Sequence, residues 1–408
     1  MKIGIIHSKL NGKGGSQRQA LCLAYELQKM GNEVKVYTLA YNKERCFTKI
    51  LETLHIVVLA GGVVKRKPIK GLGALNYFWY AARESKAAHA LAKMIDKDTA
   101  VLNAHDRLGF KIAAYAKKYV HPFSTVLMMN DILTKTWIAW RRSQFRKERA
   151  PSMPQRLFNR LVDFYEVRKF ILPHDKIVVL DKRTRDWVRH YFGKEAVIVR
   201  SGIDTQEFSY VPHVLVKDGE VRILMAGIFF IHRRYEDVIR AVAMLGGKGY
   251  NIMLTIAGAY TGNTEYSEYQ RNIADLAHEL GVDMRVVFLG QISDEKLKQS
   301  YQENDIYISA NHLQSWGLAV FEAMASGCPV VVSKTAGASE VLTDEENALL
   351  VEAQNPEAYA EAIERLITDS ALYAALSVNG RKFVEHSISW RKYAEGMMRV
   401  FTDVIRLR

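Results

Sequence analysis

Short apolar, strand-like segments alternate with helical segments along this chain, and this alternation constrains the fold more than any other feature. An apolar run at 2–6 is followed by a glycine-rich turn, a helical segment and an alternating segment at 34–38. Further strand-like segments lie at 100–104, 125–129, 177–180, 222–226, 252–257, 285–289, 305–309 and 330–333. Strands separated by helices predict parallel sheets that helices cover on both faces.

The alternation restarts near residue 221 and so divides the chain into two similar halves. A length of 408 residues fits two domains of roughly 150–200 residues each. Residues 205–220, with Pro212 and Asp218-Gly219, are the expected linker. We predict an α/β fold of two Rossmann-like domains that face each other across a central cleft. Ligands bind such sheets at the carboxyl ends of the strands, which makes the cleft the expected site.

The net charge of +13 indicates an anionic partner, such as a phosphorylated small molecule, an acidic lipid headgroup or nucleic acid. Residues 135–170 interleave basic with aromatic side chains, a pattern typical of an anionic membrane surface. A solvated face over an ordinary core stripe is the alternative. Nothing here matches an RNA-binding module, so we expect no nucleic-acid partner.

The cysteines and the N-terminus bear on where the protein resides. Cys22, Cys46 and Cys328 are too few and too scattered for a disulfide framework, which indicates a reducing compartment. The chain opens directly on a strand, without a secretion leader, and its longest apolar stretch has 9 residues, whereas a membrane span needs about 20. We expect a cytoplasmic protein that can lie peripherally on the cytoplasmic face of the membrane.

Residues 314–333, QSWGLAVFEAMASGCPVVVS, carry the most distinctive motif. Glu322 lies in an otherwise apolar helical run from Leu318 to Ala325. A buried carboxylate is costly unless it has a partner, so Glu322 is a candidate site residue with a ligand hydroxyl as its partner. The alternative is a carboxylate on the exposed side of an amphipathic helix.

Two glycine-containing loops follow strands. Gly12-Lys13-Gly14-Gly15 precedes a helix, where glycines and the helix N-terminus can accommodate a phosphate; a plain tight turn is the alternative. Gly227 ends a strand, and the adjacent Arg233 and Arg234 could clamp a diphosphate. The alternative is a pair of surface arginines that pair with Glu236 and Asp237.

Polar residues also close two strands of the first half. His105 could bond a sugar hydroxyl, and Asp131, which follows Asn130, could accept from an acceptor hydroxyl. The alternatives are a satisfied loop histidine and, for Asp106, an ordinary helix cap. Asp96-Lys97-Asp98 precedes a strand and is interpreted as a solvated turn. The sequence holds no clustered His/Cys pattern, so we expect no metal.

Together these residues resemble the retaining GT-B glycosyltransferases of family 4, over nearly the whole chain. GNEVKVYT at 31–38, RSGIDTQEF at 200–208, ILMAGIFFIHRRYED at 223–237 and ISWRKYAEGMMRVF at 388–401 are similar to family motifs. The strongest similarity is GLAVFEAMASGCPVVVS combined with TAGASEVL at 335–342. The resemblance implies an acceptor-binding domain at 1–205, a nucleotide-sugar-binding domain at 206–388, and a last helix at 389–408 that crosses back onto the first.

The resemblance also implies roles for individual residues. Glu322 would accept hydrogen bonds from the ribose diol, and Arg233 would stabilise the departing nucleotide diphosphate. The residues implied in donor binding are Gly14, Gly15, Gly227, Arg233, Arg234, Ser315, Trp316, Gly317, Leu318, Ala319 and Glu322. Those implied in catalysis are His105, Asn130, Asp131, Arg233 and Gln314.

Three positions depart from the family pattern. Gln314 replaces the first glutamate of a Glu-x7-Glu pair and cannot carry its charge. Ile228 replaces the usual arginine after the strand-end glycine, which leaves Arg233 and Arg234 for the phosphates. Asn130 occupies the position of the N-domain histidine, for which His105 is the candidate substitute.

We therefore expect a metal-independent transferase that moves a hexose from a UDP- or GDP-sugar to an acceptor hydroxyl with retention of configuration. The acceptor would be a glycan, a lipid-linked glycan or another glycoconjugate. A GT-B protein that binds nucleotide sugars without turnover is the main alternative, and the three departures motivate it. A sugar-nucleotide epimerase is a further alternative, disfavoured by the 314–333 motif and the Ser-Trp start of the last helix.

Overall fold

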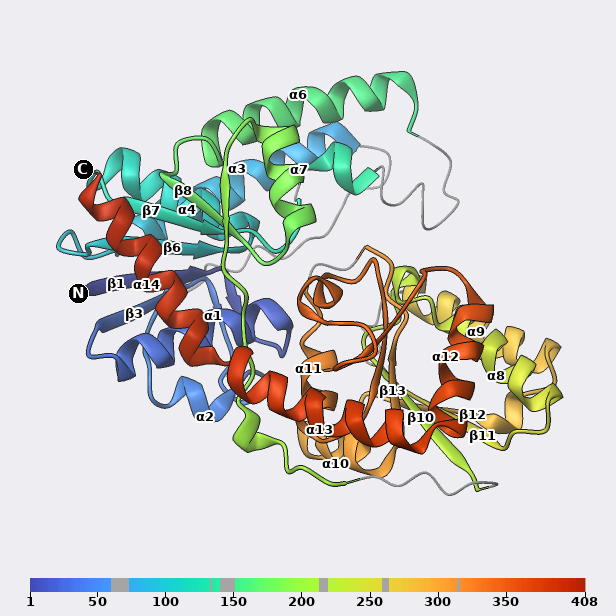
Figure 1. Ribbon diagram of the computed structural model, residues 1–408. Helices are drawn as coiled ribbons and strands as arrows, with labels where there is room; N and C mark the ends of the chain where they lie inside the picture. The colour runs from blue at the N-terminus through green and yellow to red at the C-terminus, as the bar shows by residue number, and fades with distance from the viewer. Residues whose placement is uncertain are drawn as a thin grey trace. The chain divides into compact units, whose positions relative to one another are not determined.

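The computed structural model describes residues 1–59, 73–132, 134–139, 151–212, 219–258, 264–313 and 316–407. The chain divides into unit 1, Met1–Ser201 with Trp390–Arg408, and unit 2, Gly202–Ser389 (Figure 1). Each unit contains a parallel sheet covered by helices, so the predicted α/β class is confirmed.

The sheet of unit 1 has seven parallel strands in the order β5-β3-β1-β6-β7-β8-β9. In that order they are His55–Val58, Glu33–Thr38, Lys2–His7, Val101–His105, Ser124–Met128, Lys176–Val179 and Ala196–Ile198. The helices of the unit are α1 (Gly15–Lys29), α2 (Thr48–Leu51), α3 (Gly73–Ala92), α4 (Asp106–Tyr119), α6 (Met153–Phe170), α7 (Lys182–Phe192) and α14 (Trp390–Arg406). A short ladder pairs β2 (Lys9–Leu10) with β4 (Ala40–Tyr41).

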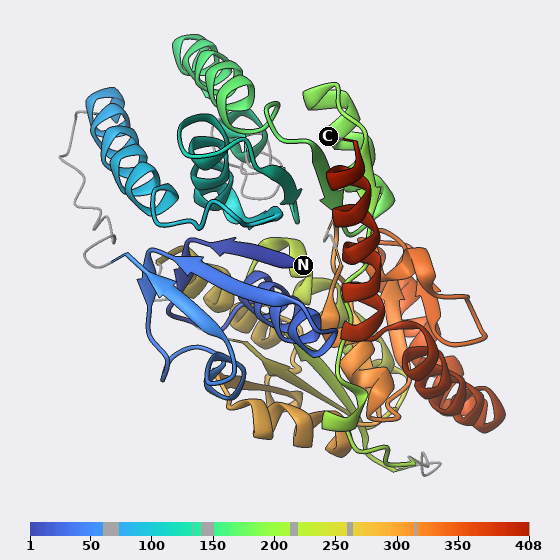
Figure 2. The same ribbon diagram turned by 90° about the vertical axis from the view of Figure 1, so that its left-hand side faces the viewer.

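Helix α14 is the last element of the chain, and it packs against α1 and β7 of unit 1 (Figure 2). Its apolar residues recur every three or four positions, so one face of the helix is buried. That face includes Trp390, Tyr393, Met397 and Phe401, and the Tyr393 hydroxyl donates to Met128 Sδ at 3.4 Å. The C-terminal segment is therefore part of the unit that the N-terminus begins.

The sheet of unit 2 has six parallel strands in the order β12-β11-β10-β13-β14-β15. In that order they are Val286–Gly290, Ile252–Ala257, Val221–Ala226, Ile306–Ser309, Val330–Ser333 and Leu349–Val351. Its helices are α8 (Tyr235–Gly247), α9 (Thr264–Glu279), α10 (Asp294–Glu303), α11 (Leu318–Ala325), α12 (Pro356–Thr368) and α13 (Ser370–Ser387). Short 3-10 turns are η1 (Thr205–Glu207), η2 (Ile231–Arg233), η3 (Asp283–Arg285) and η4 (Gly337–Val341).

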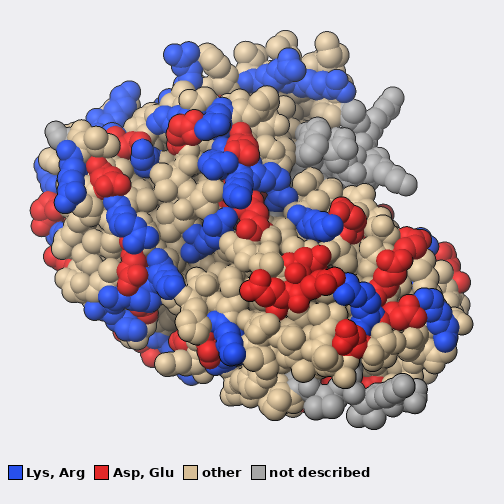
Figure 3. All heavy atoms as spheres, in the orientation of Figure 1, with Lys and Arg blue, Asp and Glu red and all other residues tan. Residues whose placement is uncertain are grey.

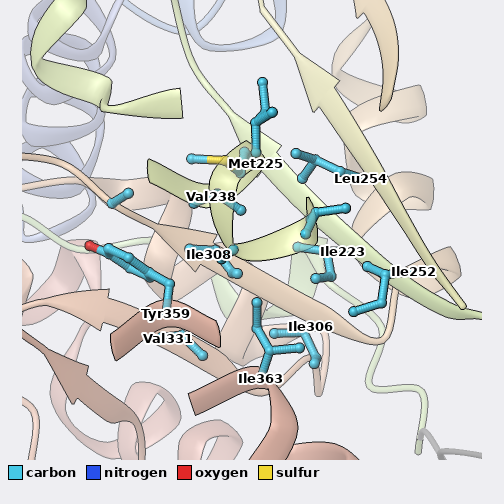
Figure 4. Close-up of a cluster of buried hydrophobic side chains, with 14 of the residues drawn as sticks. Ile223, Met225, Val238, Ile252, Leu254, Ile306, Ile308, Val331, Tyr359 and Ile363 are labelled. Atoms are coloured by element: carbon cyan, nitrogen blue, oxygen red, sulfur yellow. The ribbon is translucent and has the colours of Figure 1, made fainter. Parts of the chain in front are cut away.

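The core of unit 2 lies between this sheet and its helices, where strand side chains meet Val238 of α8 and Tyr359 and Ile363 of α12 (Figure 4). Because helices cover the sheet on both faces, its strands are apolar without alternation, as in Val330–Ser333. Asn355 caps α12 by accepting from the Ala358 amide, and Pro356 follows at the first helical position. No described helix combines the length and apolarity that a membrane crossing requires.

Candidate functional site

The order of the strands in unit 2 reverses between β10 and β13. The chain runs from β10 outward to β11 and β12, and then returns to place β13 on the other side of β10. Loops that leave adjacent strands at such a point diverge to opposite faces of the sheet, which opens a crevice at the carboxyl ends of the strands. The predicted donor-binding residues that the structure describes in this unit lie on the loops and helices after these two strands.

Arg233 connects the loops that follow β10 and β13. Its Nη1 donates to Asn311 Oδ1 at 3.2 Å, and Asn311 Nδ2 donates to Ser309 Oγ at 2.6 Å. The guanidinium lies against Gly227, where a Cβ would come within 2.7 Å of Arg233 Cζ. Gly227 also has a φ of 152°, a region that favours glycine. The loop is therefore built to hold one arginine at the point of strand reversal.

Arg234 has a different environment from its neighbour. It forms a fork with Asp237, with Nε–Oδ2 and Nη2–Oδ1 distances of 2.9 and 2.7 Å, and its Nη1 lies 2.7 Å from Glu236 Oε1. This is the pairing that the sequence left open as the alternative to diphosphate binding. Arg234 thus serves to start α8, in a left-handed conformation with a φ of 55°, while Arg233 is held at the strand ends.

Glu322 lies on α11, the helix that follows β13, and is 5% exposed. The alternative of a solvent-facing carboxylate is therefore wrong. The carboxylate accepts a hydrogen bond from the Tyr301 hydroxyl at 3.0 Å, and Tyr301 itself is fully buried. Burial raises the pKa of the nearby Tyr307 hydroxyl, with electrostatic contributions from both Arg233 and Glu322. Both residues thus lie within electrostatic range of one buried tyrosine.

The N-terminus of α11 begins at Gly317, whose φ of 90° places it in the left-handed region. Leu318 and Ala319 form the first turn, whose amides have no partner within a helix and create partial positive charge. Trp316 is buried against Phe321, with ring centroids 4.8 Å apart. Gln314 and Ser315 lie outside the described residues.

Two polar residues of this site were not identified from the sequence. Asn311 is the second residue after β13, and Tyr301 lies on α10, 21 residues before Glu322. The position of Asn311 after an apolar strand is a signal that sequence reasoning could have used. No such signal exists for Tyr301, because its contact with Glu322 depends on the packing of α10 against α11.

Unit 1 has its own point of strand reversal, between β1 and β6. Ser8 follows β1 and donates from its amide and its hydroxyl to Asp106 Oδ2, at 3.0 and 2.6 Å. Asp106 also accepts from the Gly109 amide at 2.7 Å, and its φ of 59° is unusual for a residue other than glycine. Asp106 therefore caps α4, as its alternative interpretation held, and also ties the two strand ends together.

His105 is fully buried at the end of β6, and its Nε2 lies 2.9 Å from Asn103 Oδ1. Burial lowers the pKa of His105 to about 3, with a smaller contribution from His7, so the imidazole is neutral. A side chain without exposed surface can reach an acceptor only if its surroundings move. The surroundings of His105 are therefore those of a histidine that bonds neighbouring residues of the unit, such as Asn103, rather than one that contacts a ligand.

Asn130 and Asp131 follow β7. Asn130 Nδ2 donates to Gln19 Oε1 of α1 at 2.8 Å, while Asn130 Oδ1 is buried without a protein partner within the described part of the chain. Asp131 Oδ1 accepts from the Ile132 amide at 2.8 Å and from Trp137 Nε1 at 3.2 Å. Gln19 was not singled out by the sequence analysis, although it lies one turn into the helix that begins at the glycine loop.

The glycine loop of unit 1 leads into α1, with Gly14 as the residue that precedes the helix and Gly15 as its first residue. A Cβ on Gly14 would come within 2.6 Å of Gln17 Oε1. The next residue, Ser16, places its hydroxyl 3.1 Å from Nε2 of the buried His7 at the end of β1. The start of α1 is therefore anchored to the same strand-reversal point as Asp106.

Comparisons with known proteins agree on one family. An uncharacterized glycosyltransferase of Methanocaldococcus jannaschii is 27% identical over 239 residues, which are 55% of this chain and 59% of that protein. A D-inositol 3-phosphate glycosyltransferase of Acidothermus cellulolyticus is 32% identical over 155 residues, 38% of this chain and 34% of that protein. The chain thus spans less than two thirds of the length of these relatives.

Solved structures match over almost the whole chain. Sucrose-phosphate synthase from Thermosynechococcus elongatus has a TM-score of 0.77 at 20% identity and covers 100% of both chains. Anabaena HepE, solved in complex with UDP and glucose, has a TM-score of 0.73 at 16% identity over 99% of this chain and 100% of that one. These similarities show that the fold is GT-B.

Two family descriptions match consecutive parts of the sequence. Residues 13–207 match Glycosyltransferase Family 4, and residues 210–383 match Glycosyl transferases group 1. Together the matched parts include Gly14, Gly15, Arg233 and Glu322. The chain belongs to the family 4 glycosyltransferases of group 1.

Proposed function

We propose that this protein transfers a hexose from a nucleotide sugar to an acceptor hydroxyl with retention of anomeric configuration. The family to which it belongs is a retaining one. The observation that carries the proposal is Arg233, held by Asn311 at the strand-reversal point of unit 2 with Glu322 on the helix after the neighbouring strand. This arrangement supplies one cation and one carboxylate at the edge of the sheet where parallel α/β units bind nucleotides.

Arg233 would stabilise the diphosphate as it leaves. The bond between the anomeric carbon and the phosphate oxygen breaks, and the bond to the acceptor oxygen forms on the same face of the sugar. The acceptor proton passes to the leaving phosphate oxygen. Negative charge grows on the diphosphate during this step, so a fixed guanidinium and the first amides of α11 lower the barrier.

Glu322 would hold the ribose of the donor. A carboxylate that already accepts from Tyr301 keeps further acceptor capacity, because two carboxylate oxygens offer about four lone-pair sites. A ribose diol presents two hydroxyl donors. Complexes of HepE with UDP and UDP-glucose make a uridine nucleotide the first donor to test, with GDP-sugars next.

Unit 1 would bind the acceptor. The buried Asn130 Oδ1, which has no partner within the described part of the chain, would accept a hydrogen bond from a hydroxyl of the acceptor. Asp131 would then orient the attacking hydroxyl. We propose a glycan, a lipid-linked glycan or another glycoconjugate as the class of acceptor.

The main alternative is a protein that binds nucleotide sugars without turnover. This alternative is motivated by Asn130 and Ile228, which stand where the family has a histidine and an arginine. Like the proposed transferase, such a protein would bind the nucleotide sugar. Unlike the transferase, it would release no nucleotide and transfer no sugar.

A thermal-shift panel of UDP-, GDP- and ADP-sugars tests donor binding, because a ligand that binds only the folded protein raises its melting temperature. Turnover is then measured as release of the nucleotide. Arg233→Gln keeps a side-chain donor for Asn311 but removes the charge, and we expect kcat to fall at least about a hundredfold, the scale of losing one group that stabilises transition-state charge. Full turnover by Glu322→Ala with the nucleotide sugar that binds would exclude the proposed site.

A further inference from the structure

The outer faces of α3 and α6 expose large apolar side chains. On α6 these are Met153, Leu157, Leu161 and Phe164, with exposed fractions from 61% to 77%. Spacings of three and four residues place them along one stripe of the helix. Phe78 and Trp79 of α3 are 59% and 48% exposed. We call these six residues the apolar stripe.

Side chains of the two helices contact each other beside this stripe. The rings of Phe78 and Phe158 have centroids 6.2 Å apart, and the Tyr77 hydroxyl of α3 donates to Glu166 Oε1 of α6 at 3.0 Å. Both views show α3 and α6 along the same side of unit 1 (Figures 1 and 2). The exposed apolar residues of the two helices therefore belong to one surface.

On these two helices the acidic side chains bond groups inside the unit, whereas the exposed charged side chains are basic. Glu84 of α3 and Glu166 of α6 turn inward to Arg107 and Lys111 of α4, a cluster in which Lys111 is only 2% exposed. Asp163 accepts from the amides of Lys135 and Thr136. Each acidic residue described on these two helices is thus engaged with groups inside the unit.

The exposed charges described on the same helices are all positive. They are Arg83 and Lys86 on α3 and Arg156, Arg160 and Arg168 on α6, which we call the basic rim. The guanidinium of Arg83 lies 4.2 Å from the Trp79 ring centroid and that of Arg168 lies 5.1 Å from the Phe164 centroid. Lys and Arg side chains dominate this edge of the molecule, where α6 lies (Figure 3).

We propose that the α3–α6 surface binds an anionic lipid bilayer. An apolar stripe enters the boundary between headgroups and acyl chains, and a rim of cations faces lipid phosphates at the same depth. An ordinary solvated helix face has neither property, because it mixes both signs of charge and carries scattered apolar residues. The surface adds a partner to the proposed transferase and is consistent with a lipid-linked acceptor, but vesicle binding does not depend on turnover.

The stripe differs from the segment that the sequence indicated. The basic and aromatic residues of 135–170 led to a membrane-surface prediction, and residues 140–150 lie outside the described part of the chain. The structure assigns the surface to α6 together with α3, which the sequence analysis did not implicate. It also assigns Asp163, Glu166 and Phe158 to the inner side.

Flotation with vesicles tests the proposal. The whole protein is mixed, without nucleotide sugar, with vesicles of phosphatidylcholine alone or of phosphatidylcholine with phosphatidylglycerol. We expect binding to the anionic vesicles at low salt and weaker binding at high salt, because salt screens the interaction of exposed charges. No binding to anionic vesicles at low salt overturns the proposal, and so does equal binding to the neutral vesicles.

Two triple variants separate the stripe from the rim. Leu157→Gln/Leu161→Gln/Phe164→Gln removes apolar area, and Arg156→Gln/Arg160→Gln/Arg168→Gln removes charge. Each should lower the partition coefficient on anionic vesicles at least about tenfold, and the second should also flatten the salt dependence. Because all six side chains are exposed, the melting temperature should change little.

The matched control, Arg240→Gln/Arg271→Gln/Lys382→Gln, removes the same charge from exposed positions of unit 2. It should bind vesicles like the parent protein, and an equal loss in this control would mean that net charge rather than the surface binds lipid. Sedimentation of the protein without lipid tests whether a second copy of the chain covers the apolar stripe instead. A dimer that Leu161→Gln dissociates would show that a second copy covers the stripe and would overturn the proposal. Nucleotide-sugar turnover, measured separately, tests the transferase itself.

Discussion

The guanidinium of Arg233 lies directly against the main chain of Gly227, where a Cβ would be 2.7 Å from Arg233 Cζ and 2.9 Å from its Nε. The absence of a side chain at residue 227 therefore determines where the positive charge lies. The φ of 152° at Gly227 adds a second reason for glycine at this position.

Gly227→Ala should displace Arg233 and strain the backbone at once. We expect a loss of about 1–2 kcal/mol in the free energy of unfolding, the cost of an unfavourable positive φ. Donor affinity should fall by at least about tenfold, the equivalent of 1.4 kcal/mol, because the guanidinium no longer lies at the strand ends. Denaturant unfolding and calorimetric titration with the nucleotide measure the two effects. Gly247→Ala, at an open position of α8, is the control, and it should leave donor affinity unchanged.

Tyr301→Phe removes the hydroxyl that donates to Glu322 Oε2 at 3.0 Å. A hydrogen bond to a charged group contributes about 1.5–3 kcal/mol, and the carboxylate stays buried after the change. We expect a loss of stability of that size, together with weaker nucleotide binding because Glu322 is less firmly oriented. A normal unfolding curve with normal donor affinity would show that Tyr301 has no role in holding Glu322.

Asp106 satisfies the Ser8 amide, the Ser8 hydroxyl and the Gly109 amide from a left-handed backbone conformation. Asp106→Ala should cost about 2 kcal/mol, the upper end of the range for a lost helix cap. Asp106→Asn should cost less, because asparagine tolerates this conformation and keeps one acceptor. Urea unfolding measures the loss of stability in each variant. Equal losses in the two variants would contradict the role of Asp106 as a cap in a left-handed conformation.

Glu166 should give stability a pH dependence. Burial alone would raise the pKa of this carboxyl, but Arg107 and Lys111 outweigh burial and hold the pKa below 4.5. A lowered folded-state pKa contributes stability that is present above the unfolded value of 4.5 and is lost as pH falls below it. Glu166→Gln should cost about 3 kcal/mol at pH 7, since it leaves Arg107 and the buried Lys111 with less compensation.

The stability difference between this variant and the parent protein should narrow as the pH falls below 4.5. Unfolding curves recorded from pH 7 to about pH 3.5 measure the difference. Glu195→Gln is the control, because its partner Arg189 is exposed and an exposed pair contributes little. A difference that stays constant with pH would show that Glu166 acts through packing rather than through its charge.

Much of the fold could be predicted from the sequence because buried parallel strands are continuous apolar runs. The run at 330–333 is a strand, and the helix from Leu318 to Ala325 has the predicted limits. The strands missed were short or at the edges of the sheets, such as Ala196–Ile198 and Leu349–Val351. A three-residue strand has too few residues for a periodic pattern to be recognised.

The site was predicted less completely than the fold. Spacing after a strand identified Arg233 and Glu322 as candidates, but it could not distinguish Arg233 from Arg234. That distinction depends on two other residues. Asp237 forms an ion pair with Arg234, and Gly227 has no side chain and so leaves room for Arg233. In unit 1, the burial of His105 depends on long-range packing around β6, which single residues in a sequence do not reveal.

The position of α14 in the chain affects the order in which the two units can fold on the ribosome. Unit 2 is continuous from residue 202 to residue 389, whereas unit 1 lacks α14 until residues 390–406 have been made. At roughly 5–20 residues per second, the parts of α1 and β7 against which α14 packs stay uncovered for about 10–40 s after the rest of unit 1 has emerged. The second half of the chain can therefore complete its fold before the first half, and a nascent first half is a natural client for chaperones that bind exposed apolar surfaces.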